Sequence, residues 1–462
     1  MRRGFLKPNP SQLKGNTHRA SRSSQADKSS MITTQAVDKP LLKSAPLATI
    51  PVPHGPIIPV NEYVDSKTLM DWHTDEAKAG PDGMYTYRIT SLPIVPRFSS
   101  DRMTACIITK GAKEGILALP GFPSPYSAIS LVREGPATGA GLGLFATTAR
   151  QPGDCIISER PLLILPRSMM VPELKPGVPN VQAQMVQGAI NRMRLDDRAR
   201  FLALKNCKSG SDVLTGILDT NAMQIGPLPS YPVDHVAICA TVSRINHSCS
   251  PNAVFAWDVN SFTCFIRALK PIAAGDEITI TYTYPLAPRT ERQEDLRQKY
   301  AFTCTCETCS LPPTESKRSD VRRKILAMYE PHYEELSTNA ANTDRWYEDH
   351  EASLRCWVED VSLPDNYITK ECLRLVEMLD AETWMLETSW PWVLQKLVKA
   401  CCALEDREGA QKWANRAAEM CRARSAKGDD CGWGKVASHP ERTEYWGLRA
   451  KMRARDNSTK QG

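Results

Sequence analysis

The chain has 462 residues, of which 42% are hydrophobic and 24% charged, and its net charge is +6. This length favours two or three folded units, and the composition excludes collagen-like, wholly disordered and multi-span membrane proteins. The charge is too small for this length to indicate a nucleic-acid binder. The 15 cysteines are an odd number, and no hydrophobic segment follows Met1. We therefore expect reduced thiols, and a metal site wherever cysteines cluster tightly.

Residues 1–80 are predicted to form a disordered basic tail. Between Met1 and Val60, nine Lys and Arg stand against two Asp and Glu, among many Ser, Thr and Pro residues. Such a segment buries too little apolar surface to offset the entropy lost on ordering. Its Arg- and Ser-rich, acid-poor beginning also matches a mitochondrial transit peptide, which is the alternative interpretation. The longest apolar runs are far shorter than the roughly 18 residues that span a bilayer, so no membrane association is expected.

Short apolar runs separated by Gly, Pro and polar turns predict strands between residues 82 and 166. We interpret 81–126 as a strand-rich extension that precedes the main β domain. From about 167 to 240 the composition predicts a helical insert, most clearly over 181–207. Strands then resume, because 253–258 and 263–269 flank a polar turn and predict a hairpin. The β-branched and aromatic run 277–284 predicts one further strand.

Residues 312–430 are predicted to form a helical domain. In 393–404 and in 410–421, apolar residues recur at steps of three and four, as one buried helix face requires. The link Glu405–Gly409 is short, so these two helices should pack as an antiparallel pair of tetratricopeptide type. One such pair cannot bury its own apolar face and must stack on neighbouring helices. We expect this domain to offer a surface for a protein partner, and residues 431–462 to form a charged tail.

Three cysteines lie within six residues, at Cys304, Cys306 and Cys309. Zn²⁺ binds four ligands tetrahedrally, and a closed shell of four thiolates is typical of a structural site. A fourth ligand must come from elsewhere in the chain, and Cys249 is available. The segment 286–311 is therefore predicted to be a zinc segment, with three chance surface thiols as the alternative.

The most informative stretch is Asn246-His247-Ser248-Cys249-Ser250-Pro251-Asn252. Taken alone, it is equally well interpreted as a polar turn. It resembles, however, the NHSCxPN motif of SET-domain protein lysine methyltransferases. Three other segments resemble further motifs of this family in the family's order: 141–146 the GxG element, 275–282 the strand with the catalytic tyrosine, and 300–309 the post-SET cysteine segment. The insert and the helical C-terminal region resemble the SMYD-like branch, although the insert lacks the cysteine array of a MYND finger.

This resemblance implies an α+β fold. A mostly β SET core over 127–285, with its helical insert, would be followed by the all-α, tetratricopeptide-like domain. It also implies an S-adenosylmethionine-dependent protein-lysine N-methyltransferase that acts on histone or non-histone proteins, in the nucleus or the cytoplasm. No direct nucleic-acid binding is expected. Methyl transfer to an amine needs positioning, desolvation and a few oxygen acceptors rather than a metal.

The resemblance also assigns roles to individual residues. Tyr282 would be the catalytic tyrosine, and a tyrosine simply buried in a strand is the alternative. Asn221 is as well explained as a turn cap, and Phe302 as a core aromatic. Tyr284 should share a face with Tyr282, because alternate residues of a strand point the same way. The implied cofactor contacts are Ala140, Gly141, Leu142, Gly143, Asn221, Asn246, His247 and Phe302; the substrate channel is Tyr300 and Tyr284; the zinc ligands are Cys249, Cys304, Cys306 and Cys309.

Two other functions remain to be weighed. The first is a SET scaffold without catalysis that binds partners through its helical domain, against which Asn246, His247 and Tyr282 all argue. The second is a zinc-dependent nucleic-acid binder, which would need a basic stripe beside the cysteines. Acidic and basic residues alternate instead over Arg289–Lys299, which indicates a solvated face of mixed charge.

Overall fold

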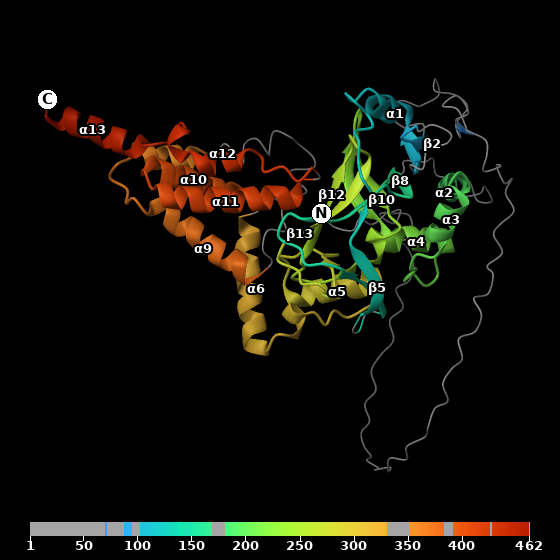
Figure 1. Cartoon of the computed structure of the whole chain (residues 1–462). Helices are drawn as coiled ribbons and strands as arrows, with labels where there is room; N and C mark the ends of the chain where they lie inside the picture. The colour runs from blue at the N-terminus through green and yellow to red at the C-terminus, as the bar shows by residue number, and fades with distance from the viewer. Residues whose placement is uncertain are drawn as a thin grey trace, which may run out of the picture.

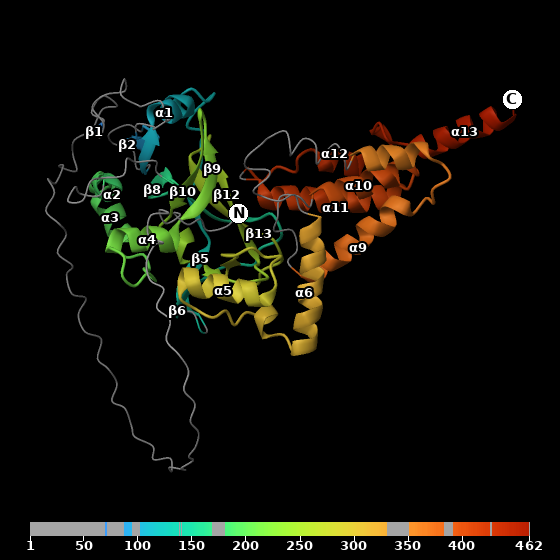
Figure 2. The ribbon, with the colours of Figure 1, turned by 180° about the vertical axis from the view of Figure 1, so that it is seen from behind.

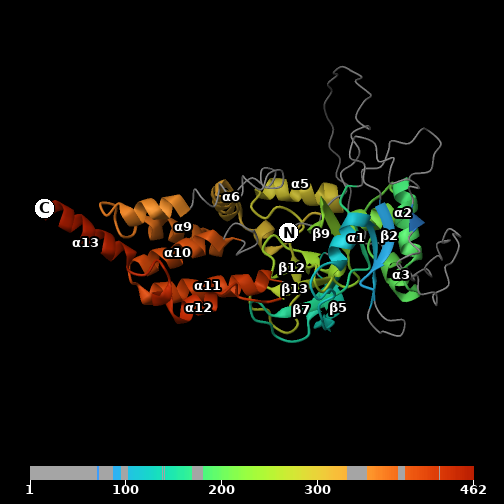
Figure 3. The ribbon, with the colours of Figure 1, turned by 90° about the horizontal axis from the view of Figure 1, so that it is seen from above.

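The protein consists of a β-rich domain and a helical domain that lie side by side, as a computed structural model shows (Figures 1 and 3). The structure describes residues 70–71, 87–94, 102–137, 139, 141–168, 181–329, 351–382, 391–425 and 427–461. Apart from 70–71, the predicted tail of residues 1–80 lies outside this part of the chain, as does Ala140. None of the described helices combines the length and the apolar character that crossing a membrane requires.

The largest sheet of the β-rich domain has six strands in the order β1-β2-β3-β8-β10-β9. Strand β3 is buried along its whole length and pairs antiparallel with β2 and parallel with β8. The described residues of the segment 81–126 therefore belong to this domain rather than preceding it. It also contains a helix, α1, whose first turn is capped by the Thr109 hydroxyl. The bounds are β1 Met70–Asp71, β2 Tyr87–Leu92, β3 Thr104–Thr109, α1 Lys110–Leu117, β8 Leu163–Pro166, β9 Met223–Leu228 and β10 Tyr231–Ile238.

A second sheet has the order β12-β13-β7-β4, and two small sheets pair β5 with β6 and β11 with β14. Strands β12 and β13 form the predicted hairpin, in register from Ala253–Ala268 to Asp258–Thr263. The strand predicted over 277–284 is much shorter than expected, because its regular pairing, with β11, covers only Thr279 and Ile280, and Glu277 forms only an isolated bridge with Phe145. The bounds are β4 Ile129–Ser130, β5 Val132–Ala137, β6 Gly141–Ala146, β7 Cys155–Glu159, β11 Asn246–His247, β12 Ala253–Asp258, β13 Thr263–Ala268 and β14 Thr279–Ile280.

The insert is helical only in its first part. Helices α2 (Val181–Asn191), α3 (Leu195–Leu202) and α4 (Val213–Asn221) group at the edge far from the helical domain (Figure 2). The Asp212 side chain caps α4 by accepting from two backbone N–H groups. After Asn221 the chain returns to the large sheet as β9 and β10. Helix was predicted up to residue 240, and this was wrong over 223–238. These residues pair as β9 and β10 at one side of the large sheet, and this pairing outweighs the helical composition that precedes it.

The helical domain is built by helices that pack on their neighbours in sequence. Helices α10 and α11 are the predicted pair, with Val393, Leu397 and Ala417 buried between them. The prediction of a charged tail over 431–462 was wrong up to residue 461, since α12 packs on α11 and Arg449 of α13 is fully buried. The bounds are α5 Arg289–Tyr300, α6 Pro313–Met328, α9 Tyr367–Ala381, α10 Pro391–Ala403, α11 Arg407–Arg424, α12 Trp433–Ser438 and α13 Leu448–Gln461, with short 3₁₀ turns η4 Glu307–Ser310 and η5 Pro440–Arg442.

The two domains touch through apolar and charged contacts. Helix α11 packs on β12 and β13, where Val254, Leu269 and Ala423 form a small buried cluster. The buried Glu382 carboxylate at the end of α9 pairs with the Arg323 guanidinium at 2.8 Å, and Arg323 also donates to a carbonyl of the β-rich domain. The backbone oxygen of Glu382 accepts a bond of 3.3 Å from the Ser250 hydroxyl. The helical domain thus contacts the residue that follows Cys249.

Candidate functional site

The polar segment 241–247 is held at both ends and in its middle. The Glu159 carboxylate accepts from the backbone N–H groups of Thr241 at 2.9 Å and Val242 at 2.6 Å. These two bonds satisfy the start of the 3₁₀ turn η3 (Val242–Arg244), whose first N–H groups have no partner within the turn. The segment ends in β11, which pairs in parallel with β14. Between these anchors, the carbonyl of Ile245 accepts from the Tyr282 hydroxyl.

Tyr282 belongs to a cluster of four aromatic rings. Its ring centroid lies 4.8 Å from that of Tyr300 and 5.3 Å from that of His247. Phe302 completes the group, with its centroid 6.2 Å from His247. The His247 Nδ1 accepts from the Tyr282 backbone N–H at 3.0 Å, so that nitrogen carries no proton. His247 and Tyr282 therefore fix each other, and three segments of the chain meet in one aromatic cluster.

A glycine-containing hairpin, β5–β6, borders this cluster. Gly141 has φ = +80°, which L side chains rarely adopt, and a Cβ built on it meets only open space. The next residue, Leu142, is 58% exposed, which is unusual for an apolar side chain and favours a ligand beside it. At Gly143 a Cβ would lie 2.4 Å from Glu277 Oε1 and 2.8 Å from Asn246 Nδ2, so only glycine allows that contact.

The four predicted zinc ligands lie together. The sulfur atoms of Cys249, Cys304, Cys306 and Cys309 are all within 4.8 Å of one another. Tetrahedral zinc–thiolate geometry places its sulfurs roughly 3.8 Å apart, so this donor set fits Zn²⁺. The Gln293 side chain fixes the loop by donating to the Cys304 carbonyl at 2.7 Å and accepting from its N–H at 2.9 Å. His247 Nε2 lies 3.2 Å from Cys249 Sγ and joins the cysteine and aromatic clusters.

Two predicted residues are not brought to the aromatic cluster. Both amide hydrogens of buried Asn221 are used within the insert, on the carbonyls of Lys205 at 2.7 Å and Ile217 at 2.8 Å. This favours the alternative of a capping asparagine. Tyr284 packs on the core of the helical domain, whereas Tyr282 belongs to that of the β-rich domain. The two tyrosines do not share a face, because the strand ends at Ile280 and its alternation ends with it.

The sequence did not reveal Glu159, Glu277 or Gln293 as site residues. Each acts through hydrogen bonds to a backbone or side chain that lies 11 to 83 residues away. Of these three residues, only Glu277 could have been found from the sequence, because it lies inside the motif 275–282. Charged residues next to a turn are usually solvated, so a pattern search passes over them.

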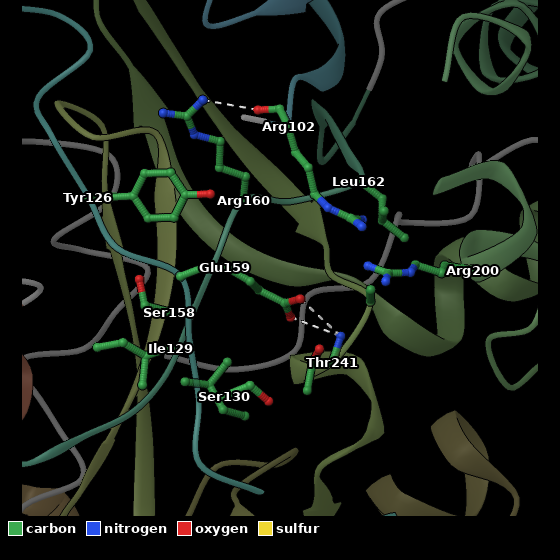
Figure 4. Close-up of a pocket in the computed structure, with 13 residues that line it drawn as sticks. Arg102, Tyr126, Ile129, Ser130, Ser158, Glu159, Arg160, Leu162, Arg200 and Thr241 are labelled. Carbon is green, nitrogen blue, oxygen red and sulfur yellow. Dashed lines mark hydrogen bonds between the residues drawn. The ribbon is translucent and has the colours of Figure 1, made fainter. Parts of the chain in front are cut away.

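A cavity of about 300 Å³ lies beside Glu159 and Thr241, which both belong to its lining (Figure 4). Arg102, Arg160 and Arg200 line it together with Tyr126. The Arg160 guanidinium stacks over the Tyr126 ring at 4.6 Å, and Arg102 pairs with two aspartates of α3. Burial raises the pKa of Glu159 above its ordinary value. Glu159 and Thr241 thus border both this cavity and the segment 241–247, whereas none of the described lining residues is a predicted cofactor, channel or zinc residue.

The comparison with known families identifies the domain that contains most of this site. The sequence pattern described as the SET domain matches residues 141–283. These residues form a SET domain. The matched range contains Asn246, His247, Tyr282 and strand β6 of the glycine hairpin, whereas strand β5, Tyr300, Phe302 and the three downstream cysteines lie outside it.

Proteins similar to this SET domain include two named methyltransferases. "Histone-lysine N-methyltransferase set5" of Schizosaccharomyces pombe is 39% identical over 19% of this chain and 28% of its own length. "N-lysine methyltransferase SMYD2-B" of Danio rerio is 26% identical over 39% of each chain. The chain thus spans well under half the length of these curated relatives. The solved "Neurospora SET domain protein DIM-5, a histone lysine methyltransferase" matches 34% of this chain and 54% of its own, with 14% identity and a TM-score of 0.18, too low to support an argument.

Proposed function

We propose that this protein is an S-adenosylmethionine-dependent protein-lysine N-methyltransferase. The observation that carries the proposal is the placement of Tyr282, whose hydroxyl is bonded to Ile245 beside Asn246, His247 and the glycine hairpin. The names of the relatives set5 and SMYD2-B support the same reaction class. We further propose that its substrates are nuclear or cytoplasmic proteins, histones included.

The residues present fit the cofactor. S-adenosylmethionine, when bound, supplies a methyl group on a positively charged sulfur. Gly141 leaves open space where a side chain would stand, and exposed Leu142 offers an apolar surface beside it. Asn246 offers an amide for the polar end of the ligand, and the half-buried Phe302 ring offers a flat face for its base. These four residues would hold the cofactor.

The aromatic cluster would prepare the lysine. Because the Tyr282 hydroxyl donates its proton to the Ile245 carbonyl, its oxygen can only accept a further hydrogen bond. That acceptor would orient the incoming amine without taking part in covalent chemistry. The Tyr282 and Tyr300 rings, 4.8 Å apart, exclude water and favour a methylammonium product by cation–π attraction. The amine must lose its proton to solvent before it reaches these rings, since only the neutral amine attacks.

We also propose that the four cysteines bind a structural Zn²⁺. The ion would tie Cys249, which lies two residues after His247, to the loop that carries Tyr300 and Phe302. A closed shell of four thiolates leaves no open position for a substrate, so its role would be to shape the site.

The test is methyl transfer from labelled S-adenosylmethionine to proteins of a cell lysate by the purified chain. We expect label on lysine after acid hydrolysis, and its loss in Tyr282→Phe. Cofactor binding without labelled lysine would favour the non-catalytic scaffold. A chain that binds no cofactor would contradict the assignment of the site itself.

A further inference from the structure

We propose that Glu277 is a positioning residue that sets the orientation of the Asn246 side-chain amide toward the cofactor. This inference rests on the proposed function and extends it to a residue outside the expected site. Glu277 would not touch the cofactor itself. It would act through Asn246, so that the amide oxygen rather than the amide nitrogen faces the ligand.

The hydrogen bonds of Asn246 define the orientation. Its Nδ2 donates to the Leu142 carbonyl at 3.0 Å and to Glu277 Oε1 at 2.7 Å. An amide nitrogen has two hydrogens, so both are used. If the amide were flipped, its oxygen would face a carbonyl oxygen and a carboxylate, which are both acceptors. The Glu277 carboxylate therefore makes the flipped state unfavourable.

The Glu277 carboxylate is itself rigidly placed. Residue 277 forms an isolated bridge with Phe145 of β6, and its carbonyl accepts from Asn252 Nδ2 at 2.8 Å. Asn252 also accepts from the Thr279 N–H at 2.8 Å, so its side chain locks the chain around Glu277. These contacts hold the backbone on both sides of the carboxylate, as a positioning role requires.

Gly143 makes the contact possible. A Cβ at this position would stand 2.4 Å from Glu277 Oε1 and 2.8 Å from Asn246 Nδ2, in the space that the two side chains share. The φ of Gly143 is not in the left-handed region, so its lack of a side chain is explained by this close approach rather than by backbone strain. Gly143, Asn246 and Glu277 thus form one unit.

This orientation of the Asn246 amide favours a ligand with a positively charged group. An amide oxygen that faces the pocket accepts from an ammonium group, such as the α-amino group of a ligand with a free amino acid end. The carboxylate behind it adds negative potential in a partly buried place, where screening by water is weaker. S-adenosylmethionine and S-adenosylhomocysteine carry the same α-amino group, but only the first carries a sulfonium charge.

The test is a double-mutant cycle on the full zinc-loaded chain, with both ligands measured by titration calorimetry. We expect Glu277→Ala to weaken the binding of both ligands by about tenfold, and Glu277→Gln, which keeps an acceptor oxygen, by about threefold. On an Asn246→Ala background, neither change should weaken binding further. A purely structural effect of Glu277 would persist on that background.

Two outcomes would overturn the inference. An undiminished effect of Glu277→Gln on the Asn246→Ala background would show that Glu277 does not act through Asn246. A loss confined to S-adenosylmethionine would show a direct effect on the sulfonium charge. Glu294→Ala is the matched control, because this exposed carboxylate of α5 pairs with exposed Arg297 at 2.7 Å and should leave both affinities unchanged. If the unmodified chain bound neither ligand, the proposed function would fail first, and the two failures are thereby distinguished.

Discussion

The SET domain and the helical domain are stabilised in different ways. In the SET domain, the site joins distant parts of the chain: Asn246 bonds to a carbonyl 104 residues away, and Cys249 meets a cysteine 60 residues away. In the helical domain, α9, α10, α11 and α12 each pack on the next. A substitution in the first region should therefore change ligand binding through remote partners, whereas one in the second should change stability alone.

The largest difference should appear between two cysteines, the half-buried Cys306 and the buried Cys372. Cys306→Ser removes one of the four clustered thiols, so we expect loss of bound zinc and, because metal binding orders the loop, a more than ~100-fold weaker affinity for S-adenosylmethionine. Cys372→Ser, in the core of the helical domain, should cost about 1–3 kcal/mol of stability and leave zinc and cofactor in place. Burial raises the pKa of Cys372 to about 12, so it is a protonated core thiol.

Metal analysis and calorimetry on both variants measure these effects. A native chain without zinc would contradict the cysteine assignment. Equal zinc loss in both variants would remove the contrast between the two regions.

The next contrast is between Tyr282 and Tyr284, which are two residues apart and belong to different cores. Tyr282→Phe removes the oxygen bonded to Ile245, so turnover should fall at least ~100-fold, with cofactor affinity changed less than about threefold. Tyr284→Phe should change turnover by less than about threefold. Steady-state kinetics and calorimetry separate the two quantities, and parallel losses of turnover and affinity in Tyr282→Phe would assign its hydroxyl another role.

A core truncation tests the helical domain by itself. Leu397 of α10 is fully buried, so Leu397→Ala should lower the free energy of unfolding by about 2–5 kcal/mol. Because its neighbours belong to the helical core, the affinity for S-adenosylmethionine below the unfolding transition should not change. Denaturant unfolding and calorimetry measure the two effects. A drop in affinity comparable with that of Cys306→Ser would show that the domains do not respond separately.

The smallest expected effect is a pH dependence within the SET domain. Burial in β10 lowers the pKa of His235 to about 4, from an ordinary value of 6.5. The unfolded chain therefore takes up a proton before the folded one, and stability falls as the pH drops below 6.5. The contribution amounts to about 2 kcal/mol between pH 7 and pH 5. His235→Leu should lose this part of the slope in denaturant titrations, and an unchanged slope would contradict it.

Local patterns were enough to predict the parts of the fold that local contacts build. Spacing of apolar residues indicated the buried face with Val393 and Leu397, and two apolar runs on either side of a polar turn indicated the β12–β13 hairpin. The spacing of Cys304, Cys306 and Cys309 indicated a metal site. The fourth ligand, Cys249, stands in the same known motif as Asn246 and His247.

Features that depend on remote partners could not be predicted in this way. Residues 433–461 look like a charged tail until Arg449 is seen to donate to the carbonyls of Trp357 and Leu363. The helical composition of the insert gave no sign that 223–238 would add two strands to a sheet begun by β2 and β3. Glu277 is one more acidic residue near a turn until Gly143 and Asn246 are placed beside it.

The most direct test of the account is to find where the cofactor binds. Ultraviolet irradiation of the zinc-loaded chain with methyl-labelled S-adenosylmethionine, followed by mass spectrometry of its peptides, reports the residues in contact with the ligand. We predict label, displaced by S-adenosylhomocysteine, on peptides that contain 141–147, 246–247 or 300–302. Label confined to peptides that line the arginine cavity of Figure 4, around Arg160 and Arg200, would contradict the account.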